Sequence, residues 1–179
     1  MTQYIGILTA GGDNPGLNAA IRGVGKAGMN RYGMQIIGFR DGFEGLVENR
    51  CFELTLNHIS GLLALGGTIL GTSNKSDPFN YPVLQGDKDE YVFLDRSAQA
   101  VRNFEALGLT GLIAIGGDGT MTGSAKLIEK GIPIIGVPKT IDNDLVGTDV
   151  TFGFDSALVT ATEAIDKLPD SEGKAAFIN

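Results

Sequence analysis

Short apolar segments alternate with helix-length amphipathic segments along this chain, and this alternation constrains the fold more than any other feature. We expect strands at residues 4–10, 34–39, 51–56, 112–115 and 132–137. We expect helices at residues 17–31, 57–65, 95–108 and 119–130, with a last helix capped by Asp155 or Ser156. Such alternation implies βαβ units. The predicted fold is therefore α/β: a Rossmann-like, doubly wound, mostly parallel sheet with helices on both faces.

Two stretches are predicted to be loops, at residues 41–45 and 66–89. A loop as long as the second is usually functional in a compact domain. We find no internal repeat and no interdomain linker, and 179 residues suffice for a single domain with a sizeable core. Residues 1–179 are therefore taken as one domain.

Charge and rare residues exclude several classes of protein. A net charge of −7 argues against a nucleic-acid partner, which would select a basic face. No apolar run is long enough to span a membrane, and the N-terminus does not look like a signal peptide. Cys51 is the single cysteine, which fits a reducing cytoplasm. His58 is the single histidine, so a site built on several histidines is excluded.

Glycine is the outlier of the composition. The chain has 27 glycines in 179 residues, about twice the usual share of roughly 7%. They cluster around Gly11, Gly66 and Gly116, and the first and last clusters each join a predicted strand to a predicted helix. Backbone amides at such a helix N-terminus form an anion site. The first cluster alone is equally compatible with a plain tight turn.

Asp118 lies inside the last of these three glycine clusters, in the run Gly116–Thr120. A carboxylate beside phosphates is repulsive unless a cation bridges them, and Mg²⁺ is commonly held by one carboxylate together with phosphate oxygens. We therefore take Asp118 as a candidate Mg²⁺ ligand. The alternative is that Asp118 only caps the helix. The Gly-Gly-Asp-Gly sequence also occurs in diacylglycerol kinases and NAD kinases.

The segment from Pro138 to Asp144 follows a predicted buried strand, where open α/β sheets bind ligands. Asp142 could accept a proton from an attacking hydroxyl, Thr140 could donate to a phosphate, and Lys139 could neutralise the transferring group. A polar turn is the alternative. Phosphoryl transfer requires a well-positioned acceptor, a metal ion and cations. Because this segment and Asp118 offer such groups, phosphoryl transfer is the predicted reaction.

Five segments in order resemble the phosphofructokinase family, and the resemblance extends to about residue 169. The segments are residues 7–22, 66–72, 116–120, 138–144 and 151–157. The resemblance implies transfer of the γ-phosphoryl group of Mg·ATP to the 1-hydroxyl of fructose 6-phosphate, by a homo-oligomer. It also implies site residues: Asp142 as base; Asp118 for Mg²⁺; Gly11, Gly117, Gly119 and Thr120 as nucleotide cradle; Asn74 and Lys75 toward the donor; Thr140 and Asp144 on the sugar-phosphate side.

The resemblance also bears on the phosphoryl donor and on length. Family members that use pyrophosphate typically carry Asp where this chain has Gly119, so ATP is favoured. Lys139 is shared by pyrophosphate users and one group of ATP users, and Asn74 stands where many bacterial ATP enzymes have Arg. A pyrophosphate-dependent enzyme and an inactive nucleotide-binding fragment remain alternatives. The family is longer and two-lobed, so residues 1–179 are expected to be its N-terminal nucleotide-binding lobe, without the C-terminal sugar-phosphate half.

Overall fold

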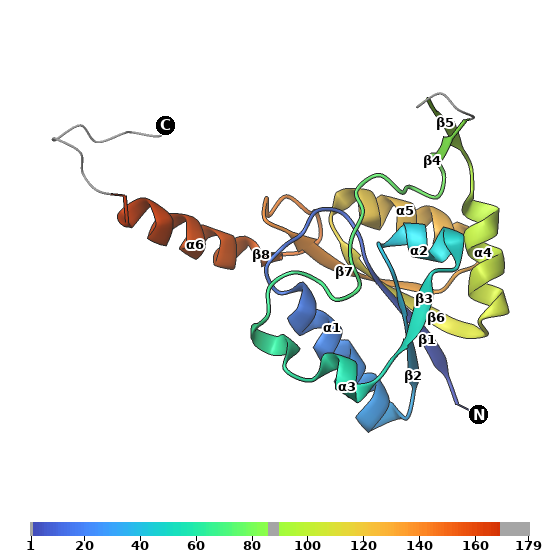
Figure 1. Cartoon of the computed structure of the whole chain (residues 1–179), viewed down its shortest axis with the longest axis horizontal. Coiled ribbons are helices and arrows are strands. Elements are labelled where there is room, and N and C mark those ends of the chain that lie inside the picture. Colours follow the sequence, from blue (N-terminus) through green and yellow to red (C-terminus); the bar gives the residue numbers. More distant parts are fainter. Residues whose placement is uncertain (1, 86–89, 169–179) are drawn as a thin grey trace.

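The computed structural model describes residues 2–85 and 90–168, which form a layered α/β structure (Figure 1). Six strands form one sheet in the order β3-β2-β1-β6-β7-β8, and β4 and β5 form a separate hairpin. The bounds of the strands are β1 Tyr4–Thr9, β2 Gln35–Phe39, β3 Cys51–Leu54, β4 Tyr81–Leu84, β5 Tyr91–Leu94, β6 Leu109–Gly116, β7 Ile134–Thr140 and β8 Phe152–Gly153.

Helices cover both faces of the sheet. On one face lie α2 (Phe43–Glu48), α4 (Ser97–Ala106) and α5 (Asp118–Glu129). On the other lie α1 (Leu17–Lys26), which continues as a π-helical stretch over Ala27–Arg31, then α3 (Leu56–Ile59) and a 3-10 turn over Leu62–Ala64. The last helix, α6 (Phe154–Asp166), extends away from the sheet.

Alternation along the central strands builds two cores, one for each face. In β1, Ile7 faces α1 and Leu8 faces α2, and neither side chain is exposed. Within the six-stranded sheet, β1 pairs in parallel with β2 and β6, β7 pairs in parallel with β6 and β8, and β3 runs antiparallel to β2. The predicted doubly wound, mostly parallel sheet with helices on both faces is confirmed.

The loop predicted at residues 41–45 is wrong, because α2 begins at Phe43. Gly45 lies inside this helix, where a Cβ atom would stand 2.2 Å from the Arg40 carbonyl oxygen. Phe43 and Leu46 are buried in the core beside it. Burial of these apolar side chains outweighs the low helix propensity of glycine.

The loop predicted at residues 66–89 is also partly wrong. It contains β4, which pairs antiparallel with β5 and places Pro82 opposite Phe93. Proline is tolerated here because a two-stranded hairpin consists only of edge strands. Residues 86–89 of the predicted loop lie outside the described residues.

Two helix starts differ from their predictions. Thr55, rather than Asn57, caps α3: the Thr55 amide donates to His58 Nδ1 at 3.1 Å in a reciprocal capping box. The last helix begins at Phe154 after Gly153, one or two residues before the predicted caps.

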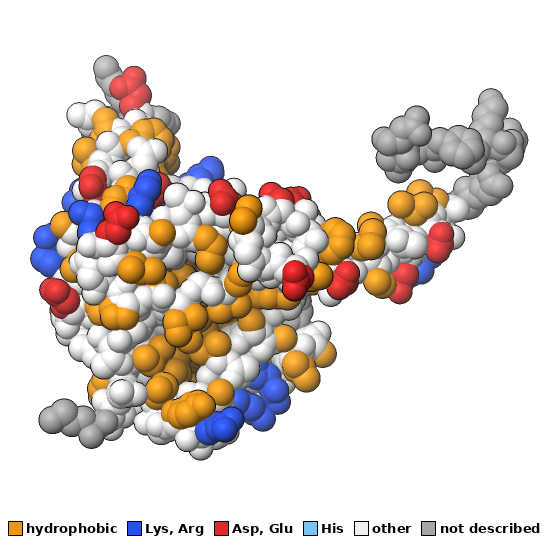
Figure 2. Space-filling view, turned by 180° about the vertical axis from the view of Figure 1, so that it is seen from behind, with side chains coloured by type: hydrophobic (Ala, Val, Ile, Leu, Met, Phe, Trp, Pro, Cys, Tyr) orange, Lys and Arg blue, Asp and Glu red, His pale blue; other side chains and the backbone are white. Residues whose placement is uncertain are grey.

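Apolar surface remains exposed on the α1 side of β6 and β7. A depression of about 620 Å³ there is lined by residues that include Ile5, Val24, Ile113 and Ile135, and Ile135 is 69% exposed. Figure 2 shows apolar side chains gathered in a band across the back of the molecule. Among the described residues, no helix combines the length and the apolar character needed to cross a membrane.

Candidate functional site

The carboxyl ends of β1, β6 and β7 lie side by side in the sheet, so the loops that follow them meet at one edge. The Ala10 amide donates to the Ile115 carbonyl oxygen at 2.9 Å, which joins the first two strand ends. The Gly11 amide donates to the Ser73 carbonyl oxygen at 3.0 Å, which brings the loop after residue 66 to the same place. Four segments distant in sequence therefore border a single site.

Gly11 lies where the predicted site residues converge. Its φ is +85°, and a Cβ atom there would stand 3.5 Å from Lys139 Nζ and 3.9 Å from Thr120 Oγ1. The Thr72 hydroxyl donates to the Gly11 carbonyl oxygen at 2.6 Å and fixes the loop. The absence of a side chain at Gly11 leaves open space between the Lys139 ammonium and the Thr120 hydroxyl.

Lys139 is a buried cation at this edge, with 4% of its surface exposed. Its Nζ atom donates to the Gly12 carbonyl oxygen at 2.5 Å. Burial lowers the pKa of the Lys139 ammonium, and the nearby Asp13 carboxylate opposes that shift. The positively charged group of Lys139 therefore lies against the glycine loop that follows β1.

The N-terminus of α5 borders the same point. Gly117 caps the helix, and a Cβ atom at this residue would stand 3.4 Å from the Lys139 carbonyl oxygen and 4.0 Å from Thr140 Cβ. A Cβ atom at Gly119, in contrast, would meet nothing within 4 Å. The first amides of this twelve-residue helix have no partner within the helix, so its N-terminus is able to bind an anion.

A cavity of about 270 Å³ occupies the space between these elements. Gly11, Asn74, Gly117, Gly119 and Thr120, all predicted as nucleotide-binding, line it. Sequence reasoning missed its other lining residues, which are Ala10, Phe43, Ser73, Ser76, Asp77 and Gly123.

One sequence signal could have found part of the missed wall. Gly119 and Gly123 are four residues apart, so they lie on one face of α5 and leave that face without side chains. A Cβ atom at Gly123 would stand 3.5 Å from Phe43 Cε2. The glycine face therefore makes room beside an aromatic ring. Lys75, in contrast, does not line this cavity and borders a neighbouring one.

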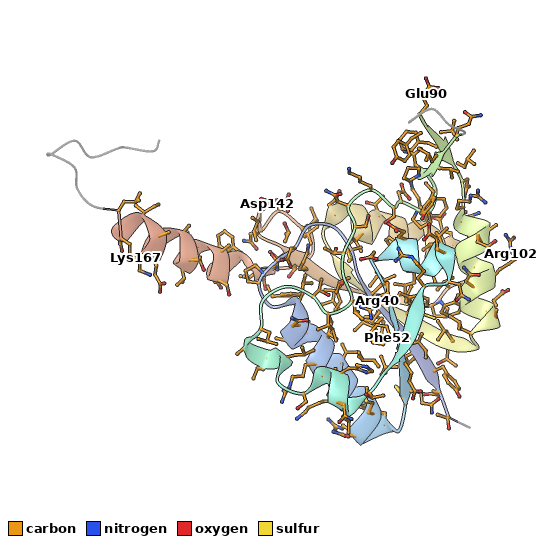
Figure 3. The ribbon with its side chains drawn as sticks, viewed as in Figure 1. Arg40, Phe52, Glu90, Arg102, Asp142 and Lys167 are labelled. Atoms are coloured by element: carbon orange, nitrogen blue, oxygen red, sulfur yellow. The ribbon has the colours of Figure 1, made fainter. Side chains whose placement is uncertain are left out.

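The predicted catalytic aspartates lie on the loop after β7. Asp142 and Asp144 are both exposed, and Figure 3 shows Asp142 near the point where α6 leaves the sheet. The Thr140 hydroxyl donates to Asp142 Oδ2 at 3.3 Å and accepts from the Asp142 amide at 3.1 Å. Neither aspartate lines the cavity of about 270 Å³.

Two hydrogen bonds from Thr151 hold the loop after β7 in place. The Thr151 amide donates to Asn143 Oδ1 at 2.9 Å, and the Thr151 hydroxyl donates to the Thr140 carbonyl oxygen at 2.8 Å. Asn143 has a φ of +52°, so the chain turns sharply between the two aspartates. The exposed carboxylates are thus carried on a turn that is anchored to the sheet edge.

Asp118 is exposed on the first turn of α5. Within residues 2–85 and 90–168, no group of three or more His, Cys, Asp or Glu side chains is arranged to hold a metal ion. Asp118 stands between Gly117 and Gly119, which both line the cavity, and its role as a Mg²⁺ ligand stays a prediction.

The family model described as phosphofructokinase matches residues 4–175, nearly the whole chain. This chain belongs to the phosphofructokinase family. An ATP-dependent 6-phosphofructokinase of Propionibacterium freudenreichii is 49% identical over 173 residues, which cover 94% of this chain and 43% of that protein. One of Chloroflexus aggregans is 50% identical over 167 residues, covering 93% of this chain and 45% of that protein. The chain thus spans less than half the length of these curated relatives.

Solved phosphofructokinase structures share the fold. Pichia pastoris phosphofructokinase in the T-state has a TM-score of 0.79 and 31% identity, and the match covers 96% of this chain and 19% of that one. A pyrophosphate-dependent phosphofructokinase of Marinobacter aquaeolei has a TM-score of 0.73 and 21% identity, over 92% of this chain and 40% of that one. At that identity the second likeness shows the fold alone.

Proposed function

We propose that residues 1–179 form the nucleotide-binding lobe of an ATP-dependent 6-phosphofructokinase. Its reaction would be transfer of the γ-phosphoryl group of Mg·ATP to the 1-hydroxyl of fructose 6-phosphate. The observation that carries this proposal is the convergence of Lys139 and Thr120 on Gly11 at the edge where β1, β6 and β7 end. The similarity to ATP-dependent 6-phosphofructokinases supports the reaction, and the remaining length of those relatives would supply the sugar-phosphate half.

The donor phosphates occupy the cavity of about 270 Å³. Gly11 has no side chain to fill the cavity, and the first amides of α5, which have no partner within the helix, favour negative charge there. Lys139 supplies a buried cation from one side, where low dielectric strengthens its attraction for a phosphate. Asn74 lines this cavity. Lys75 lines the neighbouring cavity, which Asn74 also borders.

The residues present fit a Mg²⁺ ion. Asp118 offers an exposed carboxylate on the helix turn that borders the phosphate cavity, and carboxylate and phosphate oxygens are the ligands this ion prefers. When bound, Mg²⁺ neutralises charge on the phosphate oxygens. The role of Asp118 is to hold the ion on the donor side.

Asp142 acts as the general base. Its exposed carboxylate accepts the proton of the sugar 1-hydroxyl, the hydroxyl oxygen bonds to the γ-phosphorus, and ADP leaves with the electrons of the broken bond. The contact with the Thr140 hydroxyl orients the carboxylate. Thr140 and Asp144 lie on the same turn and serve the sugar-phosphate and transition-state side.

Gly119 favours ATP over pyrophosphate. A side chain at this residue would enter open space on the cavity wall, and we assign that space to the α-phosphate. The alternative of a pyrophosphate-dependent enzyme is motivated by Lys139, which pyrophosphate users share. A competition experiment, in which ATP and pyrophosphate compete for binding to the chain, distinguishes the ATP-dependent from the pyrophosphate-dependent enzyme.

The wider setting follows from the same proposal. The partners are ATP and fructose 6-phosphate, in the cytoplasm, and the exposed apolar depression beside Ile135 supports assembly as a homo-oligomer.

A coupled assay for fructose 1,6-bisphosphate, with a parallel titration of Mg·ATP binding, tests the function. We expect Mg·ATP to bind and to support any turnover better than pyrophosphate. Binding without turnover would favour the inactive nucleotide-binding fragment, and turnover with pyrophosphate alone would favour the pyrophosphate-dependent enzyme. Absence of Mg·ATP binding would overturn the proposal.

A further inference from the structure

The irregular segment between the 3-10 turn and β4 supplies part of the lining of the phosphate cavity, namely Ser73, Asn74, Ser76 and Asp77. It passes the end of β1 on its way to the β4–β5 hairpin (Figure 1). These four residues belong to no helix or strand. Where this part of the lining lies therefore depends on the individual contacts that satisfy the backbone groups of the segment.

Two threonines join this segment to the end of β1 in both directions. Thr9, the last residue of β1, is fully buried, and its hydroxyl donates to the Gly71 carbonyl oxygen at 2.7 Å. The Thr72 hydroxyl donates back to the Gly11 carbonyl oxygen at 2.6 Å, and the Gly11 amide donates to the Ser73 carbonyl oxygen at 3.0 Å. Three successive residues of the segment are therefore bonded to β1 or to the glycine loop that follows it.

The rest of the segment is anchored independently of the two threonines. The buried Asn18 side chain holds residues 65–69 through three hydrogen bonds to their backbone groups. Beyond the cavity lining, the Arg96 amide donates to the Pro78 carbonyl oxygen at 2.7 Å. Loss of one threonine hydroxyl should therefore move residues 71–77 without releasing the remainder of the segment.

The two threonines do not line the phosphate cavity themselves. Thr9 has no exposed surface, and the residues that line the cavity include neither Thr9 nor Thr72. Asn74 does line it, and it directly follows Ser73, whose carbonyl oxygen accepts from the Gly11 amide. The side-chain amide of Asn74 can donate hydrogen bonds to a phosphate, and such bonds weaken steeply when the distance or the angle changes.

We propose that Thr9 and Thr72 are positioning residues for the phosphoryl donor and that they act through Asn74. This inference rests on the proposed function, because it requires the donor phosphates to lie in the cavity of about 270 Å³. The two hydroxyls fix the backbone that leads into Asn74 against the Gly11 loop, and thereby keep the Asn74 amide within reach of the phosphates. Without either hydroxyl a backbone carbonyl oxygen loses its partner, and the segment shifts to let water replace it.

Calorimetric titration of the whole chain with Mg·ATP tests this inference with two pairs of variants. Thr9→Val keeps the shape of the side chain but removes the hydroxyl, so Mg·ATP should bind about fivefold more weakly or worse, the usual contribution of one hydrogen bond. Thr9→Ser keeps the hydroxyl and should keep the affinity. Thr72→Val and Thr72→Ser should show the same difference at a half-buried residue, and this second pair decides the test if Thr9→Val does not fold.

An Asn74→Ala background gives a readout that a purely structural role would not move. If Thr9 acts through Asn74, Thr9→Val should cost little further Mg·ATP affinity once the Asn74 amide has been removed. An effect through the fold would instead lower the affinity by the same factor in both backgrounds, and that result would overturn the inference.

Thr110→Val is the matched control. The Thr110 hydroxyl also donates to a carbonyl oxygen distant in sequence, that of Tyr4 at 3.1 Å, but it lies at the opposite end of β6 from the cavity. Mg·ATP affinity should be unchanged in this variant, and a loss equal to that of Thr9→Val would overturn the inference. If Thr9→Val and Thr72→Val bind Mg·ATP as the wild type does, the inference fails while the proposed function stands. If the wild type binds no Mg·ATP, both fail.

Discussion

The ammonium of Lys139 donates to the carbonyl oxygen of Gly12 at 2.5 Å, across 127 residues of sequence. This hydrogen bond joins the end of β7 to the glycine loop after β1. Because Lys139 is 4% exposed, little water competes for the ammonium, and its position is determined by the loop it holds.

Replacing Lys139 with Met should weaken binding of Mg·ATP by about tenfold to a hundredfold, because a hydrogen-bonding cation contributes roughly 1.5–3 kcal/mol. Met has similar length, so the fold should persist, and removing a desolvated charge should not lower the free energy of unfolding at neutral pH. Titration calorimetry and urea denaturation measure the two quantities. Unchanged nucleotide affinity would remove Lys139 from the site.

Lys139 should also make binding and stability depend on pH in the alkaline range. Burial lowers the pKa of its ammonium below the ordinary 10.5, so affinity for Mg·ATP should fall as the pH rises through that lowered value. Between the lowered pKa and 10.5 the unfolded chain holds more protons, so this residue makes the free energy of unfolding rise with pH. Both trends should be absent in Lys139→Met, and a wild-type affinity that is flat up to pH 10.5 would contradict the assignment.

Much of this site could be predicted from the sequence, because a parallel sheet brings the carboxyl ends of its strands to one edge. The resemblance implied that Gly11 and Gly117 belong to one nucleotide cradle, and the sheet edge explains why their loops and Lys139 lie together. The bond from Lys139 to Gly12 could not be predicted, since no local pattern says which acceptor a buried lysine will meet.

Gly119 offers a direct test of donor choice. Gly119→Asp should weaken Mg·ATP binding about tenfold or more, because two charges near 4 Å apart repel by roughly 1–4 kcal/mol. Pyrophosphate binding should be retained. Gly119→Ala is the control: its Cβ atom enters open space, so ATP affinity should be kept and the helix should gain about 0.5–1 kcal/mol. Equal ATP affinity in the Asp and Ala variants would refute the α-phosphate argument.

Asp142→Asn should separate chemistry from binding. The amide keeps the size of the side chain and its contact with the Thr140 hydroxyl, but it cannot take a proton. We expect phosphoryl transfer to fall by about 10²–10⁴-fold, the usual contribution of a general base, with Mg·ATP affinity unchanged. Rates come from the coupled assay and affinity from calorimetry. Wild-type rates in the variant would show that Asp142 is not the base.

Gly153 should be intolerant of a side chain. Its φ is +104°, and a Cβ atom there would stand 2.0 Å from Nδ2 of the buried Asn14. That nitrogen donates to the Phe152 carbonyl oxygen at 3.0 Å and ties β8 to the first loop. Gly153→Ala should therefore cost about 3 kcal/mol or more, from strain at positive φ and a broken buried hydrogen bond.

Gly147→Ala is the matched control for this change. Gly147 also has positive φ, +90°, but a Cβ atom there meets nothing within 4 Å. Its cost should be limited to backbone strain, about 1–2 kcal/mol. Urea denaturation of the two variants gives the difference, and equal costs would show that the Asn14 contact does not matter.

The parts of the fold that sequence reasoning missed depend on tertiary packing. Gly42 and Gly45 indicated a loop, yet burial of Phe43 and Leu46 makes that segment a helix. Residues 66–89 were predicted to be a loop, yet Pro82 lies in β4, because a two-stranded hairpin consists only of edge strands. The contribution of Phe43 to the wall of the candidate site was missed for the same reason.

The most direct test of the central claim is a ¹H–¹⁵N NMR titration of this chain with Mg·ATP. If the glycine loops and the N-terminus of α5 hold the phosphates, the largest amide shifts should fall at Gly11, Gly117, Gly119, Thr120 and Lys139. Saturation at one nucleotide per chain is also expected. Absence of shifts, or shifts confined to the face covered by α1 and α3, would contradict the account.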